Sequence, residues 1–235
     1  MDINIKKIKK NAYRVSKDRN VTALRVRVPG GEITGDLVDI VSKIANTYGD
    51  GRIHLTTRQG FEILGIKWED IDKVNLMVAP LMDKLEINHV DANAGYPASG
   101  TRNIVACIGN KVCLKGQYDT TAFAKKIEKA IFPHDFHFKV AFTGCPNDCQ
   151  KVRSNDFGII GMALPIFDPS KCISCGRCEK KCKGLSTGAI KMVNYKPQRD
   201  HDRCIGCGEC VLNCPTSAWT RDSKKYYRLA IMGRT

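Results

Sequence analysis

The first 85 residues carry hydrophobic patterns typical of alternating strands and helices. Residues 21–28 (VTALRVRV) alternate apolar and polar positions, which predicts a strand with one buried face. Residues 37–48 repeat apolar positions at helical spacing, which predicts a helix capped by Thr34 or Asp36. The other expected elements here are strands near 52–57 and 61–66 and a helix over about 69–85. This β-α-β-β-α order predicts an α+β fold with a largely antiparallel sheet.

The rest of the chain mixes further strands and helices with a stretch that has little apolar pattern. Residues 91–100 are small and turn-forming, which predicts a loop. The expected elements are strands at 103–106, 137–143, 157–163 and 226–232 and a helix near 120–132. Between 168 and 221, Cys, Gly and Lys dominate and the apolar period fades. Such a segment has too few apolar residues for an ordinary core, so we expect it to fold around metals.

The chain has 12 cysteines, and all of them fall into four spaced groups. Two groups are pairs, C-x5-C at Cys107 and Cys113 and C-x3-C at Cys145 and Cys149. The other two are C-x2-C-x2-C-x3-C runs, Cys172, Cys175, Cys178 and Cys182 followed by Cys204, Cys207, Cys210 and Cys214. Four thiolates hold one [4Fe–4S] cluster, so the set suffices for three clusters, which indicates electron transfer.

The two longer runs match the pattern of two-cluster ferredoxins, in which the fourth cysteine of each run crosses to the other cluster. We therefore assign one cluster to Cys172, Cys175, Cys178 and Cys214 and the other to Cys204, Cys207, Cys210 and Cys182. A pair of zinc sites is the alternative, but zinc modules usually pair two C-x2-C knuckles or add histidines. The spacing of the two cysteine pairs between 107 and 149 leaves a zinc site and an unusual cluster equally open.

Basic residues accompany these cysteine pairs in the sequence. Arg25 and Arg27 lie two apart on a predicted strand and so share a face. Arg58 lies on a predicted turn, and Arg102 lies shortly before Cys107. His137 and Lys139 precede Cys145 on one predicted strand face. Solvated surface cations are the ordinary explanation, whereas cations that converge would suit an anionic cofactor and a small anionic substrate.

The formal net charge of +14 over 235 residues raises the question of an anionic partner. The basic residues show no interleaving with aromatic ones, so we expect no nucleic acid, and bound anionic cofactors would offset the charge. The sequence has no apolar run long enough to span a bilayer and no signal-peptide core at its start, so a cytoplasmic protein is expected. In a reducing compartment, clustered cysteines indicate metal ligands.

Four stretches together resemble the siroheme-dependent sulfite and nitrite reductases. They are LRVRVPGG (24–31), HLTTRQGFEI (54–63), TRNIVACIGNKVC (101–113) and FKVAFTGCPNDC (138–149). The resemblance implies that Cys107, Cys113, Cys145 and Cys149 bind a [4Fe–4S] cluster and that Cys149 also bridges to the siroheme iron. It implies substrate contacts from Arg25 or Arg27, from Arg102 and from Lys139, and siroheme carboxylate contacts from Arg58. His137 stands where the family has a lysine, so it is either a proton donor or a rim histidine.

The inserted two-cluster module narrows the resemblance to the anaerobic type of sulfite reductase. It implies siroheme, three [4Fe–4S] clusters and six-electron reduction of sulfite to sulfide. Nitrite reduction to ammonia and an electron-transfer subunit without catalysis are the alternatives. The implied partners are a ferredoxin-like subunit and a flavin subunit that oxidises NADH, and a homo-oligomer is also expected because the chain carries one half of a pseudo-symmetric unit.

The resemblance also suggests how the chain divides. The expected parts are a ferredoxin-like half (1–85), a siroheme and cluster domain (86–165), an inserted two-cluster ferredoxin domain (166–222) and a return strand (223–235). Family members continue beyond this last part with a segment that helps close the siroheme pocket, so a shortened C-terminus is expected.

Overall fold

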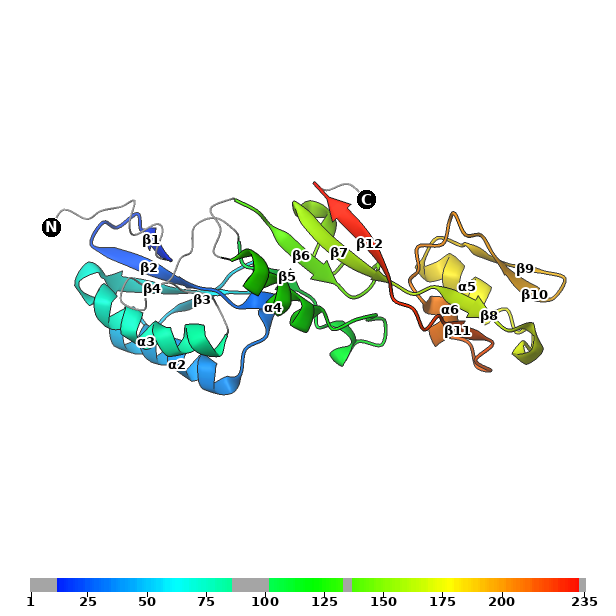
Figure 1. Ribbon diagram of the computed structural model, residues 1–235, viewed down its shortest axis with the longest axis horizontal. Coiled ribbons are helices and arrows are strands. Elements are labelled where there is room, and N and C mark those ends of the chain that lie inside the picture. Colours follow the sequence, from blue (N-terminus) through cyan, green and yellow to red (C-terminus); the bar gives the residue numbers. More distant parts are fainter. Residues whose placement is uncertain (1–11, 86–101, 133–136, 233–235) are drawn as a thin grey trace. The chain divides into compact units, whose positions relative to one another are not determined.

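The computed structural model describes residues 12–85, 102–132 and 137–232 (Figure 1). The predicted loop at 91–100 lies outside the described residues. The chain forms two compact units, each described by itself below. The first unit comprises residues 1–106 and 121–141, and the second comprises 107–120 and 142–235.

The first unit contains a four-stranded antiparallel sheet in the order β1-β2-β4-β3. Its strands are β1 (Tyr13–Val15), β2 (Val21–Val26), β3 (Ile53–Leu55) and β4 (Phe61–Lys67). The three predicted strands and the antiparallel pairing are confirmed. The sequence analysis missed β1, which is only 3 residues long and shows no alternation beyond Tyr13 buried and Arg14 exposed.

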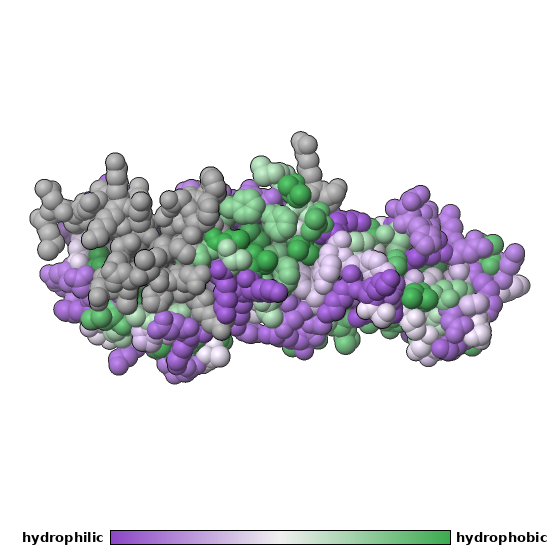
Figure 2. All heavy atoms as spheres, viewed as in Figure 1, coloured by the Kyte–Doolittle hydropathy of each residue, from purple (hydrophilic) through white to green (hydrophobic). Residues whose placement is uncertain are grey.

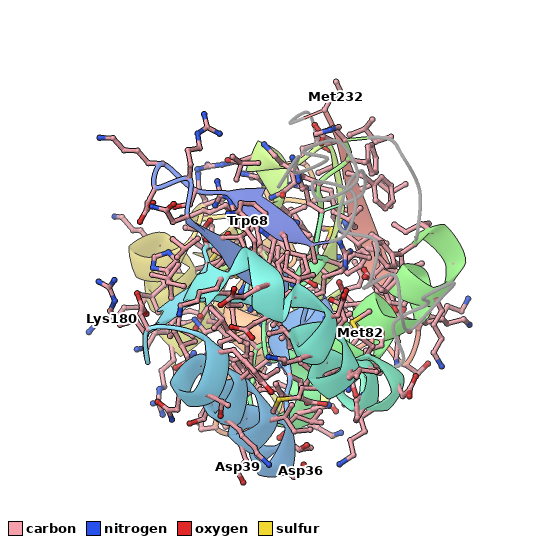
Figure 3. The ribbon with its side chains drawn as sticks, turned by 90° about the vertical axis from the view of Figure 1, so that its left-hand side faces the viewer. Asp36, Asp39, Trp68, Met82, Lys180 and Met232 are labelled. Carbon is pink, nitrogen blue, oxygen red and sulfur yellow. The ribbon has the colours of Figure 1, made fainter. Side chains whose placement is uncertain are left out.

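Two helices, α2 (Gly35–Tyr48) and α3 (Ile71–Lys84), cover one face of this sheet (Figure 1). Both match the predicted helices. Along β2, Thr22, Leu24 and Val26 are buried and alternate with more exposed positions, so one strand face enters the core with the helices. Asp36 and Asp39 lie on the side of α2 that points away from the sheet (Figure 3). Polar residues of the strands, such as Arg25, His54 and Glu62, lie on the opposite face of the sheet.

Three further elements contribute residues to the first unit. They are β5 (Val105–Ala106), α4 (Thr120–Ile131) and β6 (Val140–Thr143), which lie at or across the boundary between the units. The strand predicted at 137–143 begins later than expected. Phe138 accepts a backbone hydrogen bond from Arg102 at 2.8 Å, but residues 137–139 are exposed and the strand starts at the fully buried Val140.

The second unit contains β7 (Phe157–Met162) and β12 (Tyr226–Ile231), which pair antiparallel, with β6 next to β7. Both were predicted as strands. Tyr118 donates a hydrogen bond from its hydroxyl to the Ile159 carbonyl at 3.2 Å and packs edge-on against Tyr227. Figure 2 shows hydrophobic side chains gathered over β12, where Tyr227, Leu229 and Ile231 are exposed.

The cysteine-rich end of the second unit has regular structure that hydrophobic patterning did not predict. Its elements are β8 (Pro165–Phe167), α5 (Arg177–Leu185), β9 (Ile190–Val193), β10 (Lys196–Arg199), α6 (Glu209–Leu212) and β11 (Trp219–Arg221). Its core consists largely of cysteines, with Cys178, Cys182 and Cys210 packed against Ile190 and Trp219. Cysteines occupy core positions that apolar residues would normally fill, so the sequence shows no hydrophobic period from which these helices and strands could be predicted.

Five short 3-10 helices complete the described structure: Pro29–Gly31, Trp68–Asp70, Gly109–Lys111, Val152–Ser154 and Pro169–Lys171. Across the described ranges, we find no helix with the length and apolar character that crossing a bilayer requires.

Candidate functional site

A cavity of about 340 Å³ in the first unit is lined mostly by cations. Its charged and titratable lining residues are Arg14, Arg25, Arg27, His54, Arg58, Glu62, Arg102 and Lys139. Six of these carry a fixed positive charge and one is an acid. The structure therefore brings together Arg25, Arg27, Arg58, Arg102 and Lys139, which the sequence analysis singled out separately.

The sheet places part of this lining on the face that the helices leave uncovered. Arg25 on β2 and His54 on β3 both lie opposite Glu62 on β4 in the antiparallel register. Glu62 accepts hydrogen bonds from Arg25 Nε at 3.1 Å and from Arg14 Nη1 at 2.9 Å. One carboxylate thus holds two guanidinium groups, because cross-strand neighbours on one sheet face lie within side-chain reach.

Arg27 lies at the buried side of the cavity. It is 3% exposed and pairs with Glu128 of α4, with Nε to Oε1 at 2.8 Å and Nη2 to Oε1 at 2.7 Å. Its guanidinium also lies 3.9 Å from the ring centroid of Phe132. Burial raises the pKa of Glu128, and the Arg27 charge acts against that shift. Arg27 is therefore fixed before any anion arrives.

Arg58 lies on the turn between β3 and β4, as predicted, and its guanidinium holds the walls of the cavity together. Nε and Nη2 donate to the Asn103 carbonyl at 2.9 and 2.7 Å, and Nη2 also donates to the Val140 carbonyl at 2.8 Å. Asn103 returns a hydrogen bond from Nδ2 to the Arg58 carbonyl at 2.6 Å. Part of the hydrogen-bonding capacity of Arg58 is thus committed to the backbone of the protein.

Arg102 and His137 form a contact at the exposed rim. Arg102 Nη2 lies 3.1 Å from His137 Nδ1. Because a guanidinium only donates, Nδ1 must accept and the imidazole proton lies on Nε2. Burial lowers the pKa of Arg102, and the positive charges of Arg25, Arg27 and Arg14 lower it further. The cavity therefore carries mutual repulsion that a bound anion would relieve.

The four cysteines of the two pairs lie together in the second unit. The backbone N–H of Gly144 donates to Cys107 Sγ at 3.1 Å, and Cys107 N donates to the Phe142 carbonyl at 3.1 Å. Burial raises the pKa of Cys145, and the thiols of Cys113, Cys149 and Cys107 add to the effect. Cys145 is buried, whereas Cys113 and Cys149 are exposed. An exposed thiol at Cys149 suits a ligand that also contacts a second cofactor.

The two longer cysteine runs also interleave as assigned from the sequence. Cys172, Cys175, Cys178 and Cys214 line one cavity. Burial raises the pKa of Cys210 to about 12, and the thiols that add to the effect are Cys204, Cys207 and Cys182. The fourth cysteine of each run therefore lies with the first three of the other, as two short loops facing each other require.

These donor sets suit clusters better than single metal ions. Among the described residues, no three Cys, His, Asp or Glu side chains converge closely enough to hold one metal ion. A tetrahedral zinc site needs four ligands on a single ion, whereas each thiolate of a [4Fe–4S] cluster binds a different iron and the sulfurs stand further apart.

The sequence analysis missed several residues of the cation-lined cavity, namely Arg14, His54, Glu62 and Glu128. Glu62 stands between the apolar Phe61 and Ile63 on the strand after the Arg58 turn. Strand alternation could therefore have placed it on the polar sheet face, where Arg25 also lies. Glu128 gave no comparable pattern, because its link to Arg27 spans 101 residues of sequence.

Three family models match consecutive parts of the chain. They are the nitrite/sulfite reductase ferredoxin-like half domain at residues 14–80, the nitrite and sulphite reductase 4Fe-4S domain at 98–185, and a 4Fe-4S dicluster domain at 166–220. A subunit of the anaerobic sulfite reductase of Salmonella typhimurium is 44% identical over 100% of this chain and 72% of that protein. The chain belongs to the nitrite and sulfite reductase family.

A further relative agrees with this placement, and a solved structure shares the fold. The coenzyme F420-dependent sulfite reductase of Methanocaldococcus jannaschii is 32% identical over 68% of this chain and 25% of that protein. The crystal structure of dissimilatory sulfite reductase I matches 90% of this chain and 54% of that chain, with a TM-score of 0.65 and 17% identity. The α+β fold and the iron–sulfur character predicted from the sequence are thus confirmed within this family.

Proposed function

We propose that the protein catalyses the siroheme-dependent six-electron reduction of sulfite to sulfide. The cation-lined cavity of the first unit carries this proposal, because six fixed positive charges around one carboxylate suit a small, highly charged anion. The 44% identity to part of a sulfite reductase supports sulfite as the substrate. In the balanced reaction, hydrogensulfite takes up six electrons and six protons and gives hydrogensulfide and three waters.

The residues present fit siroheme and three [4Fe–4S] clusters. Cys149, exposed beside the three other thiols of its group, would also hold the siroheme iron, and Arg58 and its neighbouring cations would pair with the siroheme carboxylates. Siroheme would supply an iron that binds sulfur and accepts electrons through a thiolate. The convergence of six cations supports an anionic ligand here, and their mutual repulsion adds to burial in lowering the pKa of Arg102.

The cavity residues have distinct tasks in this proposal. Arg25, Arg102 and Lys139 bind the anion and stabilise the negative charge that develops on its oxygens. Arg27, held by Glu128 and Phe132, contributes a fixed charge that needs no reorganisation. With Nδ1 on Arg102, His137 can offer its Nε2–H as a hydrogen-bond donor; to deliver a proton, the ring would first have to take up a second proton on Nδ1 and leave Arg102.

Electrons must come from a low-potential donor through the clusters. We propose that the two clusters of residues 172–214 receive them and pass them to the cluster of Cys107, Cys113, Cys145 and Cys149. A ferredoxin-like subunit and an NADH-oxidising flavin subunit are the proposed partners, in a complex of several chains. Four thiolates per cluster and the fact that the S. typhimurium relative is itself one subunit of an enzyme support this arrangement.

The first experiment is an anaerobic optical spectrum with iron and acid-labile sulfide quantitation on the purified protein. The proposal expects a siroheme Soret band and its red-shifted partner together with iron for three clusters and one siroheme. A spectrum with only a broad shoulder near 400 nm would instead indicate an electron carrier without its own catalysis.

The second experiment separates the two substrates of the family. We expect kcat/KM for sulfite, with a chemically reduced viologen as donor, to exceed that for nitrite. A higher value for nitrite would contradict the proposal.

Cys149→Ser is expected to abolish sulfite reduction. Normal turnover by that variant would overturn the assignment of Cys149 as the thiolate that holds both the cluster and the siroheme iron.

A further inference from the structure

Lys115 occupies a position in the second unit that the proposed chemistry has not used. It lies two residues after Cys113, in the loop that leads from that cysteine to Tyr118. Its side chain is one-third exposed and forms an ion pair with Glu209. The loop itself is fixed, because Gln117 N donates to the Gly144 carbonyl at 2.9 Å, next to Cys145, and Gln117 Nε2 donates to the Lys115 carbonyl at 2.6 Å.

Glu209, the partner of Lys115 in this ion pair, belongs to the cysteine-rich part of the unit. It is the first residue of α6, it directly precedes Cys210, and it is 5% exposed. Asn213 Nδ2 donates to its second oxygen, Oε2, at 3.2 Å. A buried carboxylate beside cluster ligands is costly unless it is paired, so Lys115 is the group that compensates its charge.

Two further contacts hold each of these loops to another element of the unit, β11 in one case and the end of β7 in the other. Arg221 Nη2 donates to the Leu114 carbonyl at 2.6 Å, and Ala163 N donates to the Gly206 carbonyl at 2.8 Å. The loop after Cys113 and the run that begins at Cys204 are thus each anchored, and the Lys115–Glu209 ion pair joins them. The thiols of Cys145 and Cys207 both act on the charge of Lys115 and help to raise its pKa, behind the larger effect of Glu209.

We propose that the Lys115–Glu209 pair sets the relative reduction potentials of two neighbouring clusters. These are the cluster of Cys107, Cys113, Cys145 and Cys149 and the cluster of Cys204, Cys207, Cys210 and Cys182. Lys115 stabilises the extra electron on the first cluster, and Glu209 disfavours it on the second. With clusters bound, this pair of charges would favour the transfer of one electron from the second group to the first, with no bond made and no proton moved.

The pair also orders the relay. The cluster held by Cys204, Cys207, Cys210 and Cys182 would then be the direct donor to the cluster of the Cys107 group, and the cluster held by Cys172, Cys175, Cys178 and Cys214 would be the entry point. Cys175 in that entry group is exposed, as a group that takes electrons from another protein requires. This inference rests on the proposed function only in needing the three clusters.

The test measures the midpoint potential of each cluster by redox titration followed by electron paramagnetic resonance, on purified protein without sulfite. Lys115→Met is expected to shift the potential of the Cys107 group to more negative values, because a nearby positive charge favours the reduced cluster. Glu209→Gln is expected to shift the potential of the Cys204 group to more positive values. The entry cluster should not move in either variant, and Lys191→Met, on the exposed face of β9, is the charge-matched control.

The opposite signs separate an electrostatic role from a merely structural one. Loss of packing would shift both potentials in the same direction or remove iron, whereas the double variant K115M/E209Q should keep both shifts, more negative for the Cys107 group and more positive for the Cys204 group. Where Lys115→Met lowers the iron content, Lys115→Arg, which keeps the charge, should retain wild-type potentials. Unchanged potentials in variants with full iron content would overturn this inference alone, whereas absent clusters in wild type would overturn the proposed function.

Discussion

At the scale of single residues, the cavity arginines divide into those that are already paired and those that face an incoming anion. Arg27 is buried against Glu128, and Arg58 is committed to the backbone of Asn103 and Val140. Arg102 faces three other arginine charges, and its lowered pKa reflects burial and that repulsion. The two groups therefore predict different consequences of mutation, in catalysis for Arg102 and in stability for Arg27.

Replacing Arg102 by Gln should lower kcat/KM for sulfite by about 10- to 100-fold. The estimate corresponds to about 1.5–3 kcal/mol for a hydrogen bond with a charged partner. Steady-state kinetics of the holoenzyme would check it. Arg52→Gln is the matched control, because Arg52 pairs with Asp50 at an exposed site. Equal losses in the two variants would rule out a specific role for Arg102.

Replacing Arg27 by Met should lower the free energy of unfolding by about 3–5 kcal/mol, because Glu128 would stay buried without its cation. Burial already raises the pKa of Glu128, and the loss of Arg27 would raise it further. The folded variant then binds a proton more tightly than the unfolded chain, so its deficit should shrink as the pH falls. Denaturant titrations at several pH values would show this, and R27M/E128L should recover most of the loss.

At the scale of elements, the backbone of the Cys145 loop lies very close to β7, in the sheet that β7 forms with β12 and β6. A Cβ at Gly161 on β7 would collide with the carbonyl oxygen of Gly144, the residue before Cys145. Gly161→Ala should therefore cost about 1–3 kcal/mol and reduce the iron bound by the Cys107 group. Iron quantitation and thermal unfolding would measure both. Gly184→Ala on α5, where no atom lies within 4 Å, should retain full iron content.

The N-terminus of α2 predicts a dependence of stability on pH. The pKa of Asp36 is lowered to about 2, first by its hydrogen bond with Lys84 of α3 and next by that with Thr34. This contribution is present above the ordinary pKa of an aspartate, near 4, and is lost as the pH falls through about 2. Asp36→Asn should flatten that dependence in the first unit. Asp39→Asn on the same exposed side of α2 should leave it unchanged.

At the scale of the whole molecule, the two units depend on metal to different degrees. The first has an apolar core that includes Leu24, Ile44, Ile63 and Leu81, each fully buried. The cysteine-rich end of the second relies on Cys178, Cys182 and Cys210 for its core, so its folding is coupled to cluster binding.

Removing iron with a chelator should therefore unfold residues 168–221 while the first unit keeps its structure. Hydrogen exchange measured before and after chelation would resolve the two regions. Slow exchange in α2 and α3 should persist, and protection in α5 and α6 should disappear. Retained protection in α5 would show that the cysteine-rich part has a sufficient core without metal.

Local patterns in the sequence determined much of this picture. Alternation predicted β2, an apolar run predicted β7, helical spacing predicted α2, and cysteine spacing paired each run of the ferredoxin-like part with the last cysteine of the other. These features depend on neighbours within a few residues, which a single sequence displays directly. The elements between 165 and 221 escaped prediction because cysteines replace the apolar residues whose period would reveal them.

Only the tertiary structure decided which cations share a cavity and which acids hold them. Arg27 and Glu128 are 101 residues apart in sequence, Arg58 reaches Val140 over 82, and no local period links such pairs. The same holds for Lys115 and Glu209, which meet because two cysteine loops pack together. Sequence spacing grouped the cysteines, whereas the charges around them follow from long-range packing, which depends on the path of the whole chain.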